Sequence, residues 1–417
     1  MSDIQPVIDA LQGPLSALAR RFPGEPGQRQ PVHTVYGGAH LFKSDTAIKL
    51  GTLAQRALRE HAPDAKTFAG AVGLAPDLAE TIYVRVTEKL QREAVEDFRI
   101  DFEDGYGSRP DDEEDHHAAL AAREVAAGLK SGTLPPFIGI RIKPFSQELT
   151  RRSIRTLDTF LTTLLESAGA LPPWFVVTLP KIQVIEQVTA LANIFDRLEP
   201  QLGLRANELK FEFMIETTQS IPLLAAMLDA ARGRVVAAHF GTYDYTASCN
   251  ITAAEQRMDH PACDFARHAM QVAYAGTGLW LSDGATNVMP IGDRAAVHRA
   301  WRLHADHIRH SLVNGFYQGW DLNPAQLPTR YAAVYSFFLE GLGAATQRLG
   351  NFIRKAGQAT LVGDIFDDAA TGQGLLNYFL RALNCGAITE EEALATGLTL
   401  EELRSRSFVK ILRGRRG

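Results

Sequence analysis

Cysteine is scarce in this chain, and long apolar runs are missing. The 417 residues include three cysteines, Cys249, Cys263 and Cys385, too few and too scattered for a disulfide framework or a structural zinc site. No apolar run approaches the roughly 20 residues that cross a bilayer, so we expect no membrane span. The first thirty residues have neither a continuous apolar stretch nor a small-residue cleavage site. We therefore expect a cytoplasmic protein.

An excess of positive charge is missing as well. A formal net charge of -5 gives no general electrostatic reason to bind nucleic acid. The chain also lacks a Walker-type loop, a dinucleotide fingerprint between a strand and a helix, and any internal repeat. Its hydrophobic fraction of 46% and charged fraction of 22% are those of an ordinary globular protein. These absences favour a small molecule as the partner.

What the sequence contains is a regular alternation of strand-like and helix-like segments. Eight runs rich in β-branched and aromatic residues are predicted as strands, at 33–38, 98–104, 137–143, 174–181, 210–216, 235–244, 278–283 and 319–323. The segments between them place apolar residues at the three- and four-residue spacings of amphipathic helices. Eight such units over roughly 280 residues are typical of a (β/α)8 TIM barrel, and an open doubly wound sheet is the alternative. Charged residues finish at least five of the runs, which favours the barrel because an open sheet concentrates its site at one switch point.

We expect three parts in the chain. Residues 1–32 are predicted to form an N-terminal helix, from Gln5 to Arg21, and a linker rich in proline and glycine. Residues 33–323 are predicted to form the barrel. Residues 324–417 are predicted to form a C-terminal helical extension.

Two acidic residues at the ends of neighbouring predicted strands are the strongest candidates for a metal site. Glu216 ends the run that begins at residue 210, and Asp244 ends the run that begins at residue 235. Mg2+ takes only one or two protein carboxylates and keeps its other positions for water and substrate oxygens. The pair is therefore predicted to hold one Mg2+ or Mn2+, with a 2-keto acid at two open positions. The alternative is a pair of structural carboxylates matched by nearby arginine or lysine.

Arg141 and three acidic residues are further candidates. A guanidinium at the strand end of Arg141 can bind a substrate carboxylate with two hydrogen bonds and stabilise an enolate oxygen. Asp101, Glu103 and Asp104 lie where another strand ends, and at least one should hold metal-bound waters or Arg141 in place. Arg141, Glu103 and Asp104 are thus candidate catalytic residues, and Arg141 and Asp101 are candidate substrate-binding residues. An ion pair between Arg141 and Glu103 or Asp104 is the simpler alternative.

Lys181 follows another predicted strand. A Schiff-base lysine needs its ammonium group destabilised by burial or by a second cation, but several acids are expected near Lys181. We therefore predict that it organises the catalytic site through ion pairs. Gly37 and Gly38 would let the backbone approach a ligand, which makes them candidate substrate-binding positions. For His40 and His239 we favour structural roles.

Several short motifs follow one another in a fixed order. They are Asp101-Phe-Glu-Asp104, Arg141-Ile-Lys143, Leu179-Pro-Lys181, Ile215-Glu-Thr217, Gly241-Thr-Tyr-Asp-Tyr245, Leu281-Ser-Asp-Gly284 and Trp320-Asp-Leu-Asn-Pro-Ala-Gln326. Over roughly residues 33 to 330 this series resembles the citrate lyase β-subunit and HpcH–HpaI aldolase superfamily, on its citrate lyase and malyl-CoA lyase side. The resemblance implies a (β/α)8 barrel and a divalent metal on Glu216 and Asp244. It also implies that Arg141 stabilises the enolate of a small keto or acyl unit while a carbon–carbon bond breaks or forms, and that the protein is a homo-oligomer, a trimer or hexamer.

Two positions depart from the family pattern. Lys143 stands where the family has asparagine, and Asn323 stands where it has histidine, so whether the substrate is a CoA thioester stays open. In malyl-CoA lyases an aspartate from a neighbouring subunit completes the site. By resemblance, Asp364, Asp367 and Asp368 are the candidates for that role.

The sequence as a whole predicts a divalent-metal-dependent carbon–carbon lyase of the class II aldolase type. Its substrate would be a small 2-keto or 3-hydroxy carboxylic acid, or the CoA thioester of one, and the reaction would pass through an enolate. A condensing enzyme of the malate synthase type, using acyl-CoA and a 2-oxo acid, is one alternative. A metal-binding scaffold without catalytic activity is the other.

Overall fold

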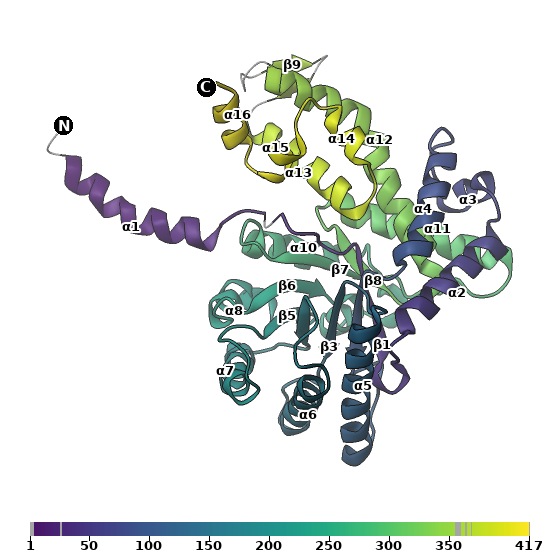
Figure 1. Cartoon of the computed structure of the whole chain (residues 1–417), viewed down its shortest axis with the longest axis vertical. Coiled ribbons are helices and arrows are strands. Elements are labelled where there is room, and N and C mark those ends of the chain that lie inside the picture. The colour runs from purple at the N-terminus through teal and green to yellow at the C-terminus, as the bar shows by residue number, and fades with distance from the viewer. Residues whose placement is uncertain (1–3, 26, 355–359, 363–364, 368, 417) are drawn as a thin grey trace.

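Eight parallel strands pair in sequence order and close into a barrel, because β8 pairs with β1 (Figure 1). The computed structural model describes residues 4–25, 27–354, 360–362, 365–367 and 369–416. The strands are β1 (His33–Gly38), β2 (Asp97–Asp101), β3 (Phe137–Arg141), β4 (Phe175–Leu179), β5 (Lys210–Ile215), β6 (Val235–Phe240), β7 (Trp280–Ala285) and β8 (Gln318–Asp321). The predicted (β/α)8 barrel is confirmed.

Helices surround the barrel and cover its outer surface (Figure 1). They are α2 (Thr46–His61), α3 (Ala65–Val72), α4 (Ala79–Glu93), α5 (Asp111–Ser131), α6 (Thr150–Ala168), α7 (Ile185–Gln201), α8 (Leu224–Ala230), α9 (Thr242–Ser248), α10 (Pro261–Tyr274) and α11 (Arg294–Val313). Phe160 of α6, for example, stacks on Phe175 of β4 with ring centroids 5.9 Å apart, whereas α3 packs on the helices α4 and α11. Full burial of one such side chain stabilises the fold by about 2 kcal/mol.

Successive side chains of a strand point to opposite faces, and this separates the two surfaces of the barrel wall. Phe98 and Ile100 of β2 belong to the apolar core, while Arg99 between them points into the barrel. Arg99 donates hydrogen bonds of 2.8 and 2.7 Å to Glu212 of β5. Because β2 and β5 are not neighbours, this buried ion pair crosses the interior, where His239 also lies 3.1 Å from Glu212.

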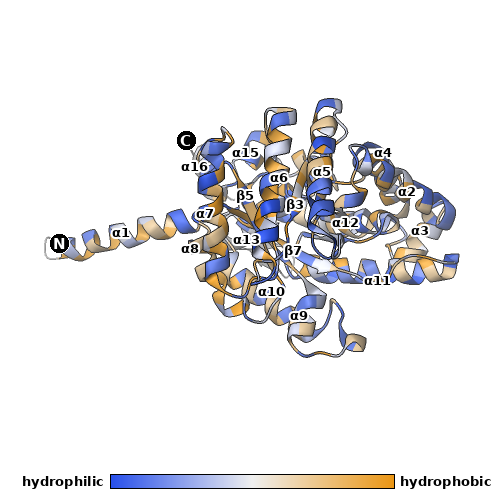
Figure 2. Cartoon of the chain, turned by 90° about the horizontal axis from the view of Figure 1, so that it is seen from below, coloured by the Kyte–Doolittle hydropathy of each residue, from blue (hydrophilic) through white to orange (hydrophobic). Residues whose placement is uncertain are grey.

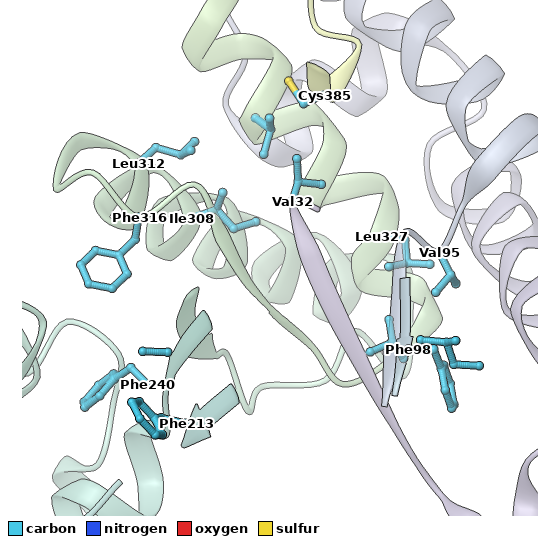
Figure 3. Close-up of a cluster of buried hydrophobic side chains, with 14 of the residues drawn as sticks. Val32, Val95, Phe98, Phe213, Phe240, Ile308, Leu312, Phe316, Leu327 and Cys385 are labelled. Carbon is cyan, nitrogen blue, oxygen red and sulfur yellow. The ribbon is translucent and has the colours of Figure 1, made fainter. Parts of the chain in front are cut away.

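One continuous apolar cluster joins the barrel to the C-terminal part of the chain. Figure 3 shows Phe98 of β2, Ile308 of α11, Leu327 of α12 and Cys385 of α13 as members of this cluster. Val32, just before β1, lies in it as well. The C-terminal extension therefore packs on the barrel through a shared core.

The extension is mostly helical, with one difference from the prediction. Its elements are α12 (Leu327–Arg354), β9 (Thr360–Val362), β10 (Ile365–Asp367), α13 (Ala369–Cys385), α14 (Glu390–Leu394), α15 (Leu400–Arg404) and α16 (Phe408–Arg416). β9 and β10 pair as a short antiparallel sheet that the sequence did not predict. Strands of three residues are too short to produce a readable alternation. Asp364, Asp368 and the side chain of Asp367 lie outside the described residues.

The N-terminal helix α1 (Gln5–Arg21) has the predicted bounds. It extends away from the rest of the molecule (Figure 1) and has no buried residue. Nowhere in the described part of the chain is a helix both long and apolar enough to cross a membrane.

Candidate active site

The carboxyl ends of β2 to β6 lie side by side at one end of the barrel. Strand pairing sets this alignment, since Asp101 pairs with Arg141 and Ile215 pairs with Phe240. It brings together six of the residues predicted from the sequence, namely Glu103, Asp104, Arg141, Lys181, Glu216 and Asp244. Beside them opens a cleft of about 370 Å³, lined by Pro144, Ser146, Lys181, Gln183, Gln187, Glu216, Thr217, Asp244, Ala247 and Ser248.

Arg141 is held in one orientation by two carboxylates and an aromatic ring. Its Nε and Nη2 donate to Asp101 at 2.7 and 2.6 Å, and its Nη1 lies 3.2 Å from Glu103. The guanidinium carbon lies 4.9 Å from the centre of the Tyr36 ring, a cation–π contact. Five N–H groups are available on a guanidinium. With three directed at these carboxylates, two can still reach a ligand.

Asp101 holds Arg141 and also the loop that follows β2. Besides Arg141, its carboxylate accepts hydrogen bonds from the backbone N–H groups of Glu103 at 3.0 Å and Gly105 at 2.7 Å. The side chain is 1% exposed. Both oxygens are thus engaged within the protein, so the geometry favours a positioning role over the direct substrate contact expected from the sequence.

Lys181 links two sides of the site. Its ammonium group contacts Glu103, lies 3.1 Å from both carboxylate oxygens of Asp104, and lies 3.8 Å from Asp244. Although burial opposes it, the negative charge of Glu103, with smaller effects of Glu216 and Asp104, raises the pKa of Lys181 above its ordinary value. Protonated lysine is not a nucleophile. The contacts therefore match the predicted organising role.

The backbone of Lys181 contributes as well. Its N–H donates to Glu216 Oε1 at 2.8 Å, and its φ of 50° lies in the left-handed region, which is uncommon for residues other than glycine. This conformation lets one residue hold Glu216 through its amide and the acids after β2 through its side chain.

Glu216 is a buried carboxylate beside a second carboxylate. It is 2% exposed, and burial, reinforced by the negative charge of Asp244, raises the pKa of Glu216 to about 8. No ion-pair partner of Glu216 occurs within the described ranges. Gly241, before α9, has to be small, because a Cβ atom there would come within 2.6 Å of Oε2 and of Cβ of Glu216. This carboxyl group is therefore packed closely at the strand end, and no positive charge of the described residues is in contact with its ionised form.

The charge balance of the site fits a divalent cation. Among the described residues beside and in the cleft, the five carboxylates of Asp101, Glu103, Asp104, Glu216 and Asp244 outnumber the two cationic side chains that contact them, Arg141 and Lys181. Hard oxygen ligands and unbalanced negative charge suit Mg2+ or Mn2+. The described residues include no group of three or more His, Cys, Asp or Glu side chains placed to hold one ion. Glu216 and Asp244 would therefore hold it with water and substrate.

Gly37 and Gly38 are explained by packing within the protein. A Cβ atom on Gly37 would lie 2.7 Å from the ring of Phe98, and one on Gly38 would lie 2.4 Å from the carbonyl oxygen of Gly105. Both distances are shorter than van der Waals contact. The close approach that requires glycine is thus made to the chain itself, and ligand binding at these positions stays a prediction.

Lys143 supports the site in a way that the sequence did not reveal. Its ammonium group donates to the carbonyl oxygen of Phe102 at 2.6 Å and lies 2.9 Å from the buried Glu114. It thereby fixes the loop that carries Glu103. Glu114 lies on α5, and no local sequence signal connects it with the end of β3.

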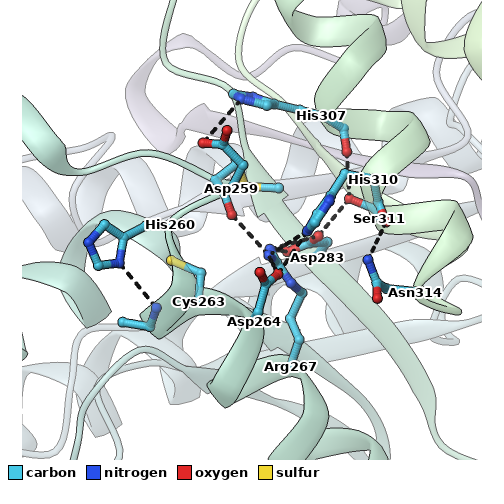
Figure 4. A network of polar contacts seen from close by, with 12 residues as sticks. Asp259, His260, Cys263, Asp264, Arg267, Asp283, His307, His310, Ser311 and Asn314 are labelled. Carbon is cyan, nitrogen blue, oxygen red and sulfur yellow. Dashed lines mark hydrogen bonds and ion pairs between the residues drawn. The ribbon is translucent and has the colours of Figure 1, made fainter.

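The Asp283 motif lies outside the site. Arg267 of α10 donates to Asp283 at 3.0 and 3.1 Å, and Ser311 of α11 donates at 2.6 Å (Figure 4). These partners come from the helices around the barrel. Asp283 therefore anchors α10 and α11 to β7.

Known structures share this architecture. Citrate lyase from Burkholderia xenovorans LB400 aligns with 18% identity and a TM-score of 0.60, covering 88% of this chain and 97% of that one. Haloferax volcanii malate synthase aligns with 14% identity and a TM-score of 0.52, covering 94% and 98%. At these identities the likeness shows a common fold, which confirms the citrate lyase-like fold implied by the sequence motifs. A complex of the same malate synthase with magnesium and glyoxylate aligns with 14% identity and a TM-score of 0.50, covering 93% and 97%.

Two further comparisons concern sequence. No curated protein matches this chain. A family model described as Domain of unknown function (DUF6986) matches residues 12–411. The chain belongs to this family.

Proposed function

We propose that this protein is a divalent-metal-dependent enzyme that breaks or forms a carbon–carbon bond through an enolate, acting as a lyase on a small 2-keto or 3-hydroxy acid or its CoA thioester. The observation that carries the proposal is the buried Glu216, directly after β5, beside Asp244 in the first turn of α9, which follows β6. No cationic side chain of the described residues forms an ion pair with Glu216. Catalytic residues of (β/α)8 enzymes occupy this end of the barrel.

The proposed cation would supply Lewis-acid polarisation of the substrate carbonyl. Arg141 supplies the second positive group. Its two free N–H groups can bind a carboxylate or the oxygen on which negative charge develops, and Asp101 and Glu103 fix their direction. A donor fixed before the reaction stabilises that charge without a cost of reorganisation.

Glu103 and Asp104 differ in their surroundings. The Glu103 side chain is 6% exposed and lies between Arg141 and Lys181, whereas the Asp104 side chain is 58% exposed. Asp104 is therefore better placed to exchange a proton with the substrate or with water, and Glu103 to hold the two cationic side chains.

The substrate class follows from charge and size. Five carboxylates outnumber the two cationic side chains of the site, so a bound divalent cation would favour an anionic acid as the substrate. The cleft of about 370 Å³ falls in the range of roughly 300–1,000 Å³ typical of small-molecule sites. It has room for more than a three-carbon acid, which leaves the thioester open as a substrate.

Calorimetric titration with Mg2+ and Mn2+ tests the proposal. We expect the metal-stripped protein to bind either ion, and pyruvate, oxaloacetate or glyoxylate to tighten the binding. Glu216→Gln should abolish metal binding, and Glu186→Gln is the matched control because Glu186 is exposed at the start of α7. Lack of metal binding in the wild-type protein, or equal binding in both variants, would contradict the proposal and favour the scaffold alternative.

A condensing enzyme of the malate synthase type is the second candidate. It is favoured by coverage, since the malate synthase alignment spans 94% of this chain and 98% of the other. Acetyl-CoA and glyoxylate should then release free CoA, measured with a thiol reagent, only when metal is present. Cleavage of a 3-hydroxy acid without CoA release under the same conditions would favour the lyase.

A further inference from the structure

The helix α1 exposes an apolar stripe that nothing in the described chain covers. The stripe, called here the α1 stripe, consists of Ile4, Ile8, Leu11, Leu15, Leu18 and Phe22, whose exposed fractions lie between 39% and 54%. Figure 2 shows apolar residues along this helix, which lies away from the body of the molecule. Arg21 donates hydrogen bonds to Asp229 and to the carbonyl oxygen of Ala225. They hold only the end of the helix.

The spacing of the α1 stripe indicates what kind of surface it fits. Its members are separated by four, three, four, three and four residues. This is the alternation with which one helix packs its side chains into the spaces between the side chains of another helix.

The helix also needs a partner to be stable. A helix of 17 residues is marginal in water even with good helix formers. Here Gly13 and Pro14 occupy its interior, and both disfavour a helix, glycine through conformational entropy and proline through its missing N–H. With no buried residue in α1, nothing within the described chain offsets these costs.

We propose that the α1 stripe packs against the α1 stripe of a second copy of this chain, with the two helices antiparallel. The charges favour this arrangement. Among the described residues of α1, the acidic Asp9 lies in the first half, and the basic Arg20 and Arg21 lie in the last turn. An antiparallel pair brings Arg20 of each helix beside the acidic half of the other helix, while Arg21 pairs with Asp229 of its own chain. The stripe is then self-complementary, as a twofold interface requires.

The surface next to the base of α1 continues the interface. Phe22 lies close to Gly276, where an added Cβ atom would be 3.8 Å from the Phe22 ring. On α10, which ends just before Gly276, Phe265 and Val272 are 63% and 87% exposed. The amino-terminal end of the partner helix would reach this region. Two arginines alone do not give the strongly basic polar face of a helix that lies on a membrane.

The molar mass of the full chain tests the proposal. Light scattering should give the wild-type protein an even multiple of 45.7 kDa. Leu11→Glu combined with Leu15→Glu should halve that mass. Ser16→Glu combined with Ala17→Glu adds the same charge on the opposite side of the helix and should leave the mass unchanged. An odd multiple for the wild type, or an unchanged mass in the stripe variant, would overturn the proposal.

Cross-linking tests the orientation. In the antiparallel pair residue 8 faces residue 18, so oxidation of a mixture of Ile8→Cys and Leu18→Cys chains should give the mixed disulfide in preference to either homodimer. Homodimeric disulfides alone would overturn the antiparallel arrangement. Flotation of the wild-type protein with anionic vesicles, lost in the stripe variant without a change of mass, would identify a membrane surface in place of the second copy.

Discussion

Replacing Asp101 with asparagine removes the charge that holds Arg141 and leaves the size of the side chain unchanged. The carboxylate accepts two hydrogen bonds from Arg141 and one each from the N–H groups of Glu103 and Gly105. In Asp101→Asn, an NH2 group would face one of these donors. Removing one partner of a buried ion pair destabilises a protein by about 3–5 kcal/mol. We expect the free energy of unfolding to fall by that amount.

Urea unfolding followed by tryptophan fluorescence measures this loss, because a shift of the midpoint at constant slope is a change in stability. The matched control is Asp45→Asn. Asp45 lies 2.9 Å from Lys49, and both side chains are largely exposed, so the same chemical change should leave the midpoint nearly unchanged. A loss below about 1 kcal/mol for Asp101→Asn, or equal losses in the two variants, would refute the reasoning.

Three other predictions concern single residues. Although burial favours its protonated form, hydrogen bonds from Arg234 and from backbone N–H groups lower the pKa of Glu199 to about 2. Because this folded-state value lies below the ordinary 4.5, the carboxylate should stabilise the fold fully above pH 4.5. About 3 kcal/mol of this stability should be lost as the pH falls toward 2. In urea unfolding, the difference in stability between wild type and Glu199→Gln should shrink from pH 7 to pH 3, and a constant difference would contradict the prediction. Gly241→Ala should weaken Mn2+ binding at least about tenfold (about 1.4 kcal/mol), because the added methyl group would lie 2.6 Å from Glu216. If calorimetry finds the wild-type affinity in this variant, Glu216 is not a ligand of the metal. Lys181 should form no imine with a keto acid. Borohydride added together with pyruvate should therefore leave the mass of the intact protein unchanged by mass spectrometry. A stable adduct on Lys181 would show that this lysine forms a Schiff base.

The sequence predicted where the strands begin more accurately than where they end. The run at 98–104 continues past Asp101, but β2 ends there because the Asp101 carboxylate binds the next backbone N–H groups and turns the chain. The run at 235–244 contains both β6, which ends at Phe240, and the start of α9 at Thr242. Loops that carry site residues continue the apolar and charged pattern of the strand, so periodicity alone does not mark the boundary.

Which residues reach the site was predictable, but how they are held was not. Residues at the ends of parallel strands meet at one end of a barrel, which is why Glu216 and Asp244 could be placed together. The partners of Asp101, the pairing of Lys143 with Glu114, and the left-handed backbone of Lys181 depend on tertiary contacts. None of these has a local signature in the chain.

The side chains in and beside the cleft fall into two sets, charged groups that ion pairs hold in place and uncharged groups that make no ion pairs. Arg141, Lys181 and the acids around them restrain one another through ion pairs at the strand ends. The uncharged side chains of Gln183 and Ala247, which also line the cleft, come from the loop after β4 and from α9. Substitutions at these two positions can therefore reshape the space for a substrate without disturbing the charged groups, whereas Ser248 binds Thr218 near Glu216. Directed evolution toward a new acid or acyl chain should begin there, and relatives of this chain can diverge in substrate choice while keeping the same chemistry.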